Sequence, residues 1–300
     1  TDQGHRARAD ARQPRGVTMP ARSKRKLIVM RASPLPLLLC IGLSLVPQVL
    51  RAEPDPPSML AELSVASLRL PAQDDPAWEG RREAIAHLLD TLQPDVIAVQ
   101  QVRQDGRRNP ACWLATRLRY SCDFITADPP SQAQRHGSAM LSRLRVDEDG
   151  VTLLHPPGRY SAAGMMRVTV ADHPLNIYVA RLRPEPDTIE SRQHQANDLM
   201  AWIAATAEGH PSVVAGDFAA SSSDVVRVLP GFQPSGRNPS GRADRGLPGQ
   251  AGDGHGLDVL FQVKSFSGKR QQRIELPAEG AQPALQLGVM AVLRLQLPAG

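Results

Sequence analysis

The sequence predicts an α/β (α+β) protein in which mixed β-sheets are covered by helices on the outside. Short apolar runs typical of buried strands alternate with longer amphipathic segments. The run PDVIAVQQV at 94–102 is almost continuous in Val and Ile before a polar exit, as in a strand buried on both faces. Several connections between predicted strands are too short for helical crossovers, which favours mixed sheets over a doubly wound parallel sheet.

The expected elements follow one another along 53–300, which we interpret as one domain. Strands are predicted at 63–70, 94–101, 137–146, 211–218, 256–263 and 287–297, and a strand pair at 165–182 turns at Asp172–Pro174. Helices are predicted at 78–92, 111–119 and 190–207. The first and last of these helices carry apolar stripes at helical spacing and are expected on the outside. The segment 231–256 is rich in Gly, Pro, Ser and Arg and predicts a long loop.

The net charge of +5 belongs to the start of the chain. Residues 1–31 hold nine Lys or Arg and two Asp, whereas 53–300 hold 25 Lys or Arg and 28 Asp or Glu. The predicted domain is therefore mildly acidic, without the basic excess that marks nucleic-acid-binding proteins.

The basic start precedes a segment with the features of a signal peptide. Residues 30–52 combine Arg31, the apolar run LPLLLCIGLSLV and the small-residue site LRA. We interpret 1–29 as upstream sequence or a basic leader. The run is short and proline-rich for a membrane span, so an uncleaved anchor is the alternative. We expect an exported protein, periplasmic or secreted, which touches a membrane only if this segment is retained.

The expected export determines whether the cysteines can form a disulfide. Removal of Cys40 with the signal peptide leaves Cys112 and Cys122, an even number in an oxidising compartment. A helix from Cys112 and a strand returning through Tyr120 would bring the two sulfur atoms together. Two buried free thiols are the alternative, and neither spacing nor neighbours indicate a zinc site.

Each polar strand end is a weak signal alone, but their succession is specific. PDVIAVQQV, HGSAMLSR, NIYVARL, SRQHQANDLMAWI, PSVVAGDF and GLDVLF follow in this order and precede a last apolar strand. This succession resembles the endonuclease/exonuclease/phosphatase superfamily, metal-dependent phosphodiesterases that include DNase-I-like nucleases, sphingomyelinases and inositol phosphatases. The resemblance covers roughly 60–297. It implies a four-layer sandwich, with two mixed sheets face to face and helices outside.

The resemblance also implies a site in which this chain keeps two carboxylates. Asp217 matches the Asp of the family's GDFN motif, which activates water, and Asp258 matches an Asp of the penultimate strand. Gln101 stands where the family has its metal-binding Glu. The family's His falls on Arg181, and its first-strand Asn falls on Arg69, or on Ser67 if the alignment slips. The other replacements are Ala219 for the Asn of GDFN and Leu285 and Gln286 for a closing Asp–His pair.

These replacements predict weak Mg²⁺ binding and little phosphodiesterase activity. A Gln amide cannot neutralise Mg²⁺ as Glu does, and the loss of one acid–base group costs roughly 10²–10⁴ in rate. We expect a catalytically impaired member that binds a phosphorylated small molecule, a lipid head group or a protein, with Arg69 and Arg181 as anion-binding candidates. It is expected to be a monomer.

The alternative is an active divalent-metal-dependent hydrolase with an altered site. Asp217 would then be the base, with His255, three residues before Asp258, near the site. The most useful observation for choosing between the hypotheses is whether Gln101, Asp217, Asp258 and Arg181 converge on one cleft. Surface ion pairs for the two arginines and a solvated loop position for His255 are the corresponding structural alternatives.

Overall fold

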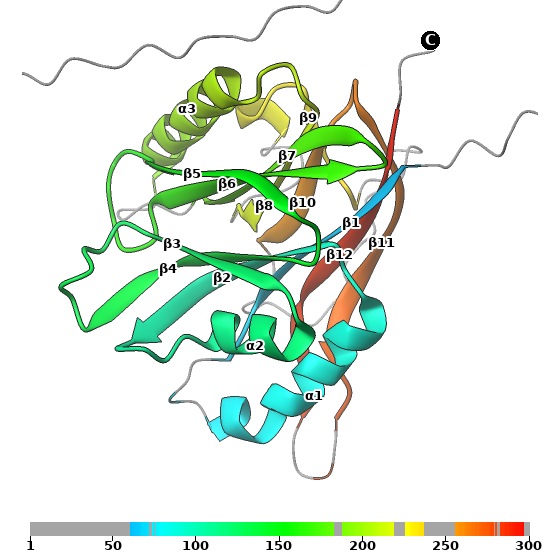
Figure 1. The fold of residues 1–300 in the computed structure, drawn as a ribbon. Helices are drawn as coiled ribbons and strands as arrows, with labels where there is room; N and C mark the ends of the chain where they lie inside the picture. Colours follow the sequence, from blue (N-terminus) through cyan, green and yellow to red (C-terminus); the bar gives the residue numbers. More distant parts are fainter. Residues whose placement is uncertain are drawn as a thin grey trace, which may run out of the picture. The chain divides into compact units, whose positions relative to one another are not determined.

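Two six-stranded β-sheets pack face to face in the described part of the chain, with helices on their outer sides (Figure 1). The computed structural model describes residues 61–71, 74, 76–182, 188–218, 226–236, 256–278, 280 and 283–296. All of these belong to one compact unit, Pro56–Gly300. The predicted leader and signal peptide at 1–52 lie outside the described residues. None of the described helices is long and apolar enough to cross a membrane.

The first sheet has the strand order β11-β12-β1-β2-β4-β3. Its only parallel pair among the described strands is β1 with β2, so the sheet is mixed. The strand bounds are β1 Glu62–Arg69, β2 Val96–Asp105, β3 Ser121–Thr126, β4 Gln134–Ser142, β11 Phe266–Leu276 and β12 Leu285–Leu295.

The second sheet has the order β5-β6-β7-β8-β10-β9, and in its described strands β7 and β8 form the parallel pair. Its strand bounds are β5 Val146–Leu153, β6 Ala162–Val170, β7 His173–Arg181, β8 Ser212–Asp217, β9 Phe232–Pro234 and β10 Leu257–Gln262. Each sheet thus contains one parallel pair, and the two parallel pairs supply the strand ends discussed below.

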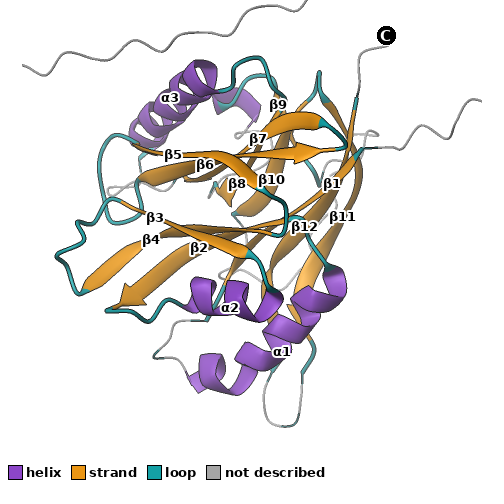
Figure 2. Ribbon diagram, viewed as in Figure 1, coloured by secondary structure: helices purple, strands orange, loops and turns teal. Residues whose placement is uncertain are grey.

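Three apolar clusters fill the spaces between four layers. One joins both sheets through residues such as Val65 and Val213, and the other two lie on the outer faces of the sheets. Helices α1 (Pro76–Leu92) and α2 (Pro110–Leu118) cover the first sheet, and α3 (Ile189–Thr206) covers the second (Figure 2). The predicted four-layer sandwich of two mixed sheets is confirmed.

Local sequence explains where the helices begin. Asn109 caps α2, because its side-chain oxygen accepts hydrogen bonds from the backbone N–H groups of Ala111 and Cys112. Thr188 caps α3 in the same way through Ser191. All three helices lie within two residues of their predicted bounds.

Several predicted strand boundaries are wrong. The predicted strand at 137–146 is two strands in different sheets, because β4 ends at Ser142 and β5 begins at Val146. The pair within 165–182 is correct, but its turn lies at Ala171 and Asp172, which have positive φ, while Pro174 is already in β7. The predicted loop 231–256 contains the short strand β9, and 237–255 lie outside the described residues.

No apolar run or alternation predicts β5 or β11. Both are edge strands, and β11 reads FSGKRQQRIEL, in which polar residues outnumber apolar ones. An edge strand buries little on its solvent side and therefore needs no apolar run. Its position is decided by the neighbour with which it pairs.

Candidate functional site

The two parallel pairs place their strand ends at the same side of the sandwich. Arg69 ends β1 beside Gln100 of β2, and Arg181 ends β7 beside Asp217 of β8. The two sheets meet there, because Arg69 Nη2 lies 2.9 Å from Asp217 Oδ2. Leu257, at the start of β10, pairs with Asp217. The structure therefore brings together the ends of the five strands on which the sequence placed its candidate residues, β1, β2, β7, β8 and β10.

Asp217 is held between two arginines. Its side chain is 1% exposed, with Arg69 at 2.9 Å and Arg181 Nε at 3.9 Å from Oδ2. The preceding Gly216 lets β8 lie close to β7, because a Cβ there would meet the Ala180 carbonyl oxygen at 2.2 Å. Of the two residues considered for the first strand, Arg69 reaches the site. Ser67 is buried and donates a hydrogen bond to the Gly216 carbonyl, 3.1 Å away.

A β-bulge shapes the end of β2. The pairing of β2 with β4 shifts between Val99 and Val102, and Gln101 has φ 55°. The bulge makes both neighbouring glutamines line one cleft. Gln100 is 1% exposed, and its amide oxygen accepts a hydrogen bond from Ser138. Its amide nitrogen is a buried donor with no hydrogen-bond partner among the described residues.

The cleft beside this bulge has a volume of about 300 Å³. Its charged lining consists of Arg69, Arg103 and Arg159, and the lining residues that the structure describes include neither Asp nor Glu. Asp217 is buried and does not line the cleft, but it pairs with Arg69, which does. The cleft is therefore lined by guanidinium groups. The Asp217 carboxylate, which the resemblance assigns to water activation, forms an ion pair with Arg69.

Tyr160 lines the cleft and lies close to several arginines. The Arg181 guanidinium lies 5.2 Å from the centre of its ring, and His136 meets the ring edge to face at 5.8 Å. Burial raises the pKa of the Tyr160 phenol, and the charges of Arg159, Arg181, Arg103 and Arg69 oppose this rise. Four guanidinium groups thus act on one phenol at the mouth of the site.

Asp258 has a different environment. Its Oδ1 accepts hydrogen bonds from Ser235 Oγ at 3.3 Å, Gln271 Nε2 at 3.2 Å and the backbone N–H of Val259 at 2.7 Å. Burial raises its pKa to about 6, and these hydrogen bonds oppose the rise. Asp258 is not part of the cleft lining.

Of the remaining predicted positions, those that the structure describes do not line the cleft. Ala219 and His255 lie outside the described residues. Leu285 packs against the apolar cluster under the helices, and Gln286 pairs with Glu275 of β11. These two residues replace an Asp–His pair in the resemblance, and neither lines the cleft that the structure describes.

The described residues of the cleft do not fit a divalent metal. A Mg²⁺ ion is usually held by one or two carboxylates together with neutral oxygens. Here the cleft offers guanidinium groups and the side chains of Gln100 and Gln101, and the Gln100 amide nitrogen is a buried donor. The Asp217 carboxylate is engaged by Arg69. No group of three or more His, Cys, Asp or Glu in the described segments is arranged to hold a metal ion.

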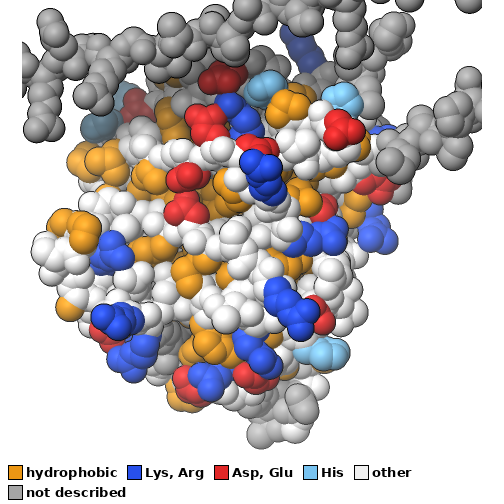
Figure 3. Space-filling view, viewed as in Figure 1, with side chains coloured by type: hydrophobic (Ala, Val, Ile, Leu, Met, Phe, Trp, Pro, Cys, Tyr) orange, Lys and Arg blue, Asp and Glu red, His pale blue; other side chains and the backbone are white. Residues whose placement is uncertain are grey.

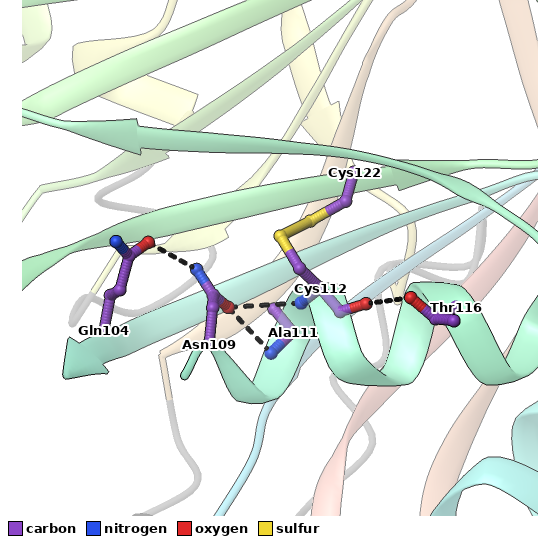
Figure 4. Close-up of a disulfide and its surroundings, with 6 residues drawn as sticks. All are labelled: Gln104, Asn109, Ala111, Cys112, Thr116 and Cys122. Carbon is purple, nitrogen blue, oxygen red and sulfur yellow. Dashed lines mark hydrogen bonds between the residues drawn. A yellow bond between two sulfur atoms is a disulfide. The ribbon is translucent and has the colours of Figure 1, made fainter. Parts of the chain in front are cut away.

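The two cysteines form a disulfide. Cys112, in the first turn of α2, is joined to Cys122 of β3, with their Cα atoms 5.4 Å apart (Figure 4). The same turn is fixed by the Asn109 cap, and the Asn109 side chain donates in turn to Gln104 Oε1 at 3.3 Å. The disulfide therefore ties the first turn of α2 to β3, the edge strand of the first sheet.

Sequence reasoning missed Tyr160, His136, Arg103 and Arg159. Arg159 and Tyr160 lie in the connection between β5 and β6, for which no element was predicted. His136 and Arg103 lie on β4 and β2 directly opposite each other. Position was the sequence signal for both, because His136 opens the motif HGSAMLSR and Arg103 directly follows PDVIAVQQV.

Comparison with known proteins supports the resemblance. The model of the Endonuclease/Exonuclease/phosphatase family matches residues 68–250, more than half of the chain. No curated protein matches the sequence at a significant level.

Solved structures match the fold at low sequence identity. A zebrafish TDP2 complexed with single-strand DNA product is 15% identical, with a TM-score of 0.60, over 78% of this chain and 99% of that one. The human Nocturnin catalytic domain with bound sulfate is 17% identical, with a TM-score of 0.62, over 79% and 94%. A Leptotrichia buccalis family protein is 13% identical, with a TM-score of 0.58, over 78% and 100%.

Proposed function

This chain belongs to the endonuclease/exonuclease/phosphatase family, and we propose that it is a catalytically impaired member that binds a phosphorylated ligand in the cleft beside Gln101. The observation that carries the proposal is the Arg69–Asp217 ion pair of 2.9 Å. It engages the carboxylate that the resemblance assigns to water activation, in a cleft whose described lining holds no other acid. A general base must lie within hydrogen-bond reach of the proton that it takes, and in this structure Arg69 engages the Asp217 carboxylate instead.

The positive charges that replace the family's catalytic groups suit anion binding. Arginine presents a planar fork of N–H donors that matches phosphate oxygens. Acidic and basic side chains are interspersed on the face shown in Figure 3, which gives no support to an extended nucleic-acid footprint. We therefore favour a small phosphorylated molecule or a phosphorylated head group as the ligand of a monomeric protein.

The second candidate is an active divalent-metal-dependent phosphodiesterase or phosphatase. Two observations favour it: Asp217 keeps its place at the end of β8, and solved structures with this fold include one described as a catalytic domain and one with a DNA product. In that case the ligand or the metal would displace Arg69 from Asp217 before reaction.

Export remains part of the proposal. The disulfide between Cys112 and Cys122 supports it, because disulfides persist in oxidising compartments and are rare in the cytosol. We propose a periplasmic or secreted protein with the segment 30–52 removed. N-terminal sequencing of the protein from its native host tests this proposal, and a mature chain that begins upstream of Arg51 contradicts it.

A magnesium titration with a generic phosphodiester substrate separates the two candidate functions. We expect wild type to show little magnesium-dependent cleavage. Gln101→Glu should strengthen Mg²⁺ binding measured by calorimetry without restoring much turnover, because Arg69 still covers Asp217. Gln132→Glu adds the same charge to an exposed loop and is the matched control. Substantial magnesium-dependent cleavage by wild type would overturn the impaired-enzyme proposal.

A further inference from the structure

We infer that the buried N–H groups of Gln100 and Arg69 form a two-donor site for one oxygen atom of the ligand, and that Gln100 is the residue which selects a ligand with such an oxygen. This inference rests on the proposed function and deepens it. It assigns the contact through which the cleft beside Gln101 holds a phosphate oxygen.

Gln100 carries a hydrogen-bond donor that its surroundings leave unpaired. The residue is 1% exposed and lines the cleft, and its Nε2 has no hydrogen-bond partner among the described residues. A buried donor without an acceptor destabilises the folded protein, because it has given up its hydrogen bonds to water. Proteins keep local violations of this kind mainly at functional sites, where a ligand supplies the acceptor.

Arg69 supplies a second donor of the same kind. It is the register partner of Gln100 in the parallel pair of β1 and β2, so the two residues stand one strand spacing apart, roughly 4.8 Å. Both line the cleft. Arg69 Nη2 is engaged by Asp217, whereas Arg69 Nε is buried without a hydrogen-bond partner in the described part of the chain. A single ligand oxygen has two lone pairs and can accept from both N–H groups.

Ser138 sets the direction of the Gln100 amide. Its hydroxyl donates to Gln100 Oε1 at 3.3 Å, and both residues are 1% exposed. Because Ser138 takes the oxygen side of the planar amide, the Nε2 side is turned away from Ser138 and stays available to the ligand. Ser138 is therefore a positioning residue, and Gln100 is the residue that contacts the ligand.

The two donors, rather than the net charge around the cleft, define this site. Arginines near the cleft have acidic partners, as Arg69 has in Asp217, and His136 Nδ1, at the cleft, lies 3.5 Å from Asp128 Oδ2. What the two N–H groups require is an acceptor. A phosphate oxygen provides one, whereas an ammonium or an apolar group would leave both donors unpaired.

Calorimetric titrations with inorganic phosphate in EDTA test the inference on a double variant, Gln100→Met with Ser138→Ala. Replacing both partners of the hydrogen bond leaves neither of them as an unpaired polar group. We expect Kd for phosphate to rise about tenfold, the worth of one hydrogen bond to a charged ligand. The melting temperature should equal or exceed that of wild type, because the unpaired donor is gone. An unchanged Kd would overturn the inference.

NMR gives a readout that does not depend on the stability of a variant. The side-chain amide signal that is missing from the double variant identifies Gln100 Nε2 in wild type. This signal should shift when phosphate is added in EDTA, as expected for a donor that gains an acceptor. A signal that does not move while phosphate binds would overturn the inference.

Two further variants locate the site. Arg69→Lys keeps the positive charge beside Asp217 but loses the Nε–H group, and Kd for phosphate should rise severalfold. Gln272→Met is the control: it removes a half-buried amide of β11 outside the cleft, whose Nε2 faces the Met290 sulfur at 4.0 Å, and should leave Kd unchanged. Equal effects of Gln272→Met and the double variant, or an unchanged Kd in Arg69→Lys, would overturn the two-donor site.

The inference and the proposed function fail on different results. Wild type that binds no phosphate in EDTA would overturn the proposed function, and the inference with it. Wild type that binds phosphate with the same Kd as the double variant would overturn the inference alone.

Discussion

Asp217 and Asp258 lie on paired strands, yet the structure treats the two carboxylates in opposite ways. Asp217 ends β8 and faces two guanidinium groups, with Arg69 at 2.9 Å. Asp258, on β10, receives hydrogen bonds from neutral donors, and burial raises its pKa to about 6. The difference teaches that a retained residue type does not retain a chemical role. The neighbours decide whether a carboxylate is an ion-pair partner or an acid that holds its proton up to about pH 6.

The same Asp→Asn change should therefore have opposite effects at the two positions, and the larger effect is expected at Asp217. Asp217→Asn leaves Arg69 and Arg181 facing a neutral amide. Breaking a buried ion pair by removing one partner costs about 3–5 kcal/mol of unfolding free energy, and the partial exposure of Arg69 places this pair at the lower end. Urea denaturation at pH 7 measures the loss.

Glu83→Gln is the control for Asp217→Asn. It removes a surface pair with Arg117 at 2.8 Å, in which both side chains are more than half exposed. Exposed pairs contribute roughly 0–1 kcal/mol, so the loss should be small. Equal losses for the two variants would show that the Arg69–Asp217 pair has no special weight.

Asp258→Asn should stabilise the protein at neutral pH. The Asn side-chain oxygen can still accept the three hydrogen bonds of Oδ1, and no buried charge remains. A pKa raised from 3.8 to about 6 corresponds to about 3 kcal/mol at pH values above 6, and a gain of about 2 kcal/mol is expected in urea denaturation.

The pH dependence gives this prediction its sign. Between about pH 4 and pH 6 the folded protein keeps the Asp258 proton that the unfolded chain has released. The contribution of Asp258 to stability therefore falls as pH rises through this window and is constant above it. The gain from Asp258→Asn should grow over the same window and vanish below pH 4. A gain that does not depend on pH would contradict the raised pKa.

The smallest expected effect is that of Ser235→Ala on the pKa of Asp258. It tests whether neutral hydrogen-bond donors set that pKa. The Ser235 hydroxyl donates to Asp258 Oδ1 at 3.3 Å and stabilises the charged form. Its loss should raise the pKa of Asp258 further, by less than one unit, because a long hydrogen bond of this kind is worth under about 1 kcal/mol. An NMR titration of the carboxyl carbon measures the shift, and a lowered pKa would contradict the assigned cause.

The sequence predicted the buried strands and the helices well, because burial of one face makes apolar residues recur at regular spacing along the chain. Strands such as 94–101 and 211–218, and the helices, follow from runs and stripes of apolar residues, which tertiary packing then uses almost unchanged. The edge strands β5 and β11 could not be predicted in this way. They bury little on one side, so their position follows from pairing with β6 and β12.

From the sequence, only those residues of the candidate site that lie at the ends of strands could be predicted. The resemblance assigned Asp217, Gln101, Arg69 and Arg181 to it, and the parallel pairs bring these positions to one side of the sandwich. Arg159 and Tyr160 come from a connection without a periodic pattern, and local sequence gives no direction to such residues. Only the packing of that connection against the sheets places Tyr160 over Arg181.

The sequence alone determined which chemical groups this protein owns: two aspartates, arginines in place of an Asn and a His, and a Gln in place of a metal-binding Glu. Tertiary structure decided what those groups do, because electrostatic interactions and pKa values depend on distance and burial, which the order of residues does not contain. Three ångströms separate Arg69 from Asp217 across 148 residues of chain. That distance, set by the packing of two sheets, turns the expected base into the buried half of an ion pair.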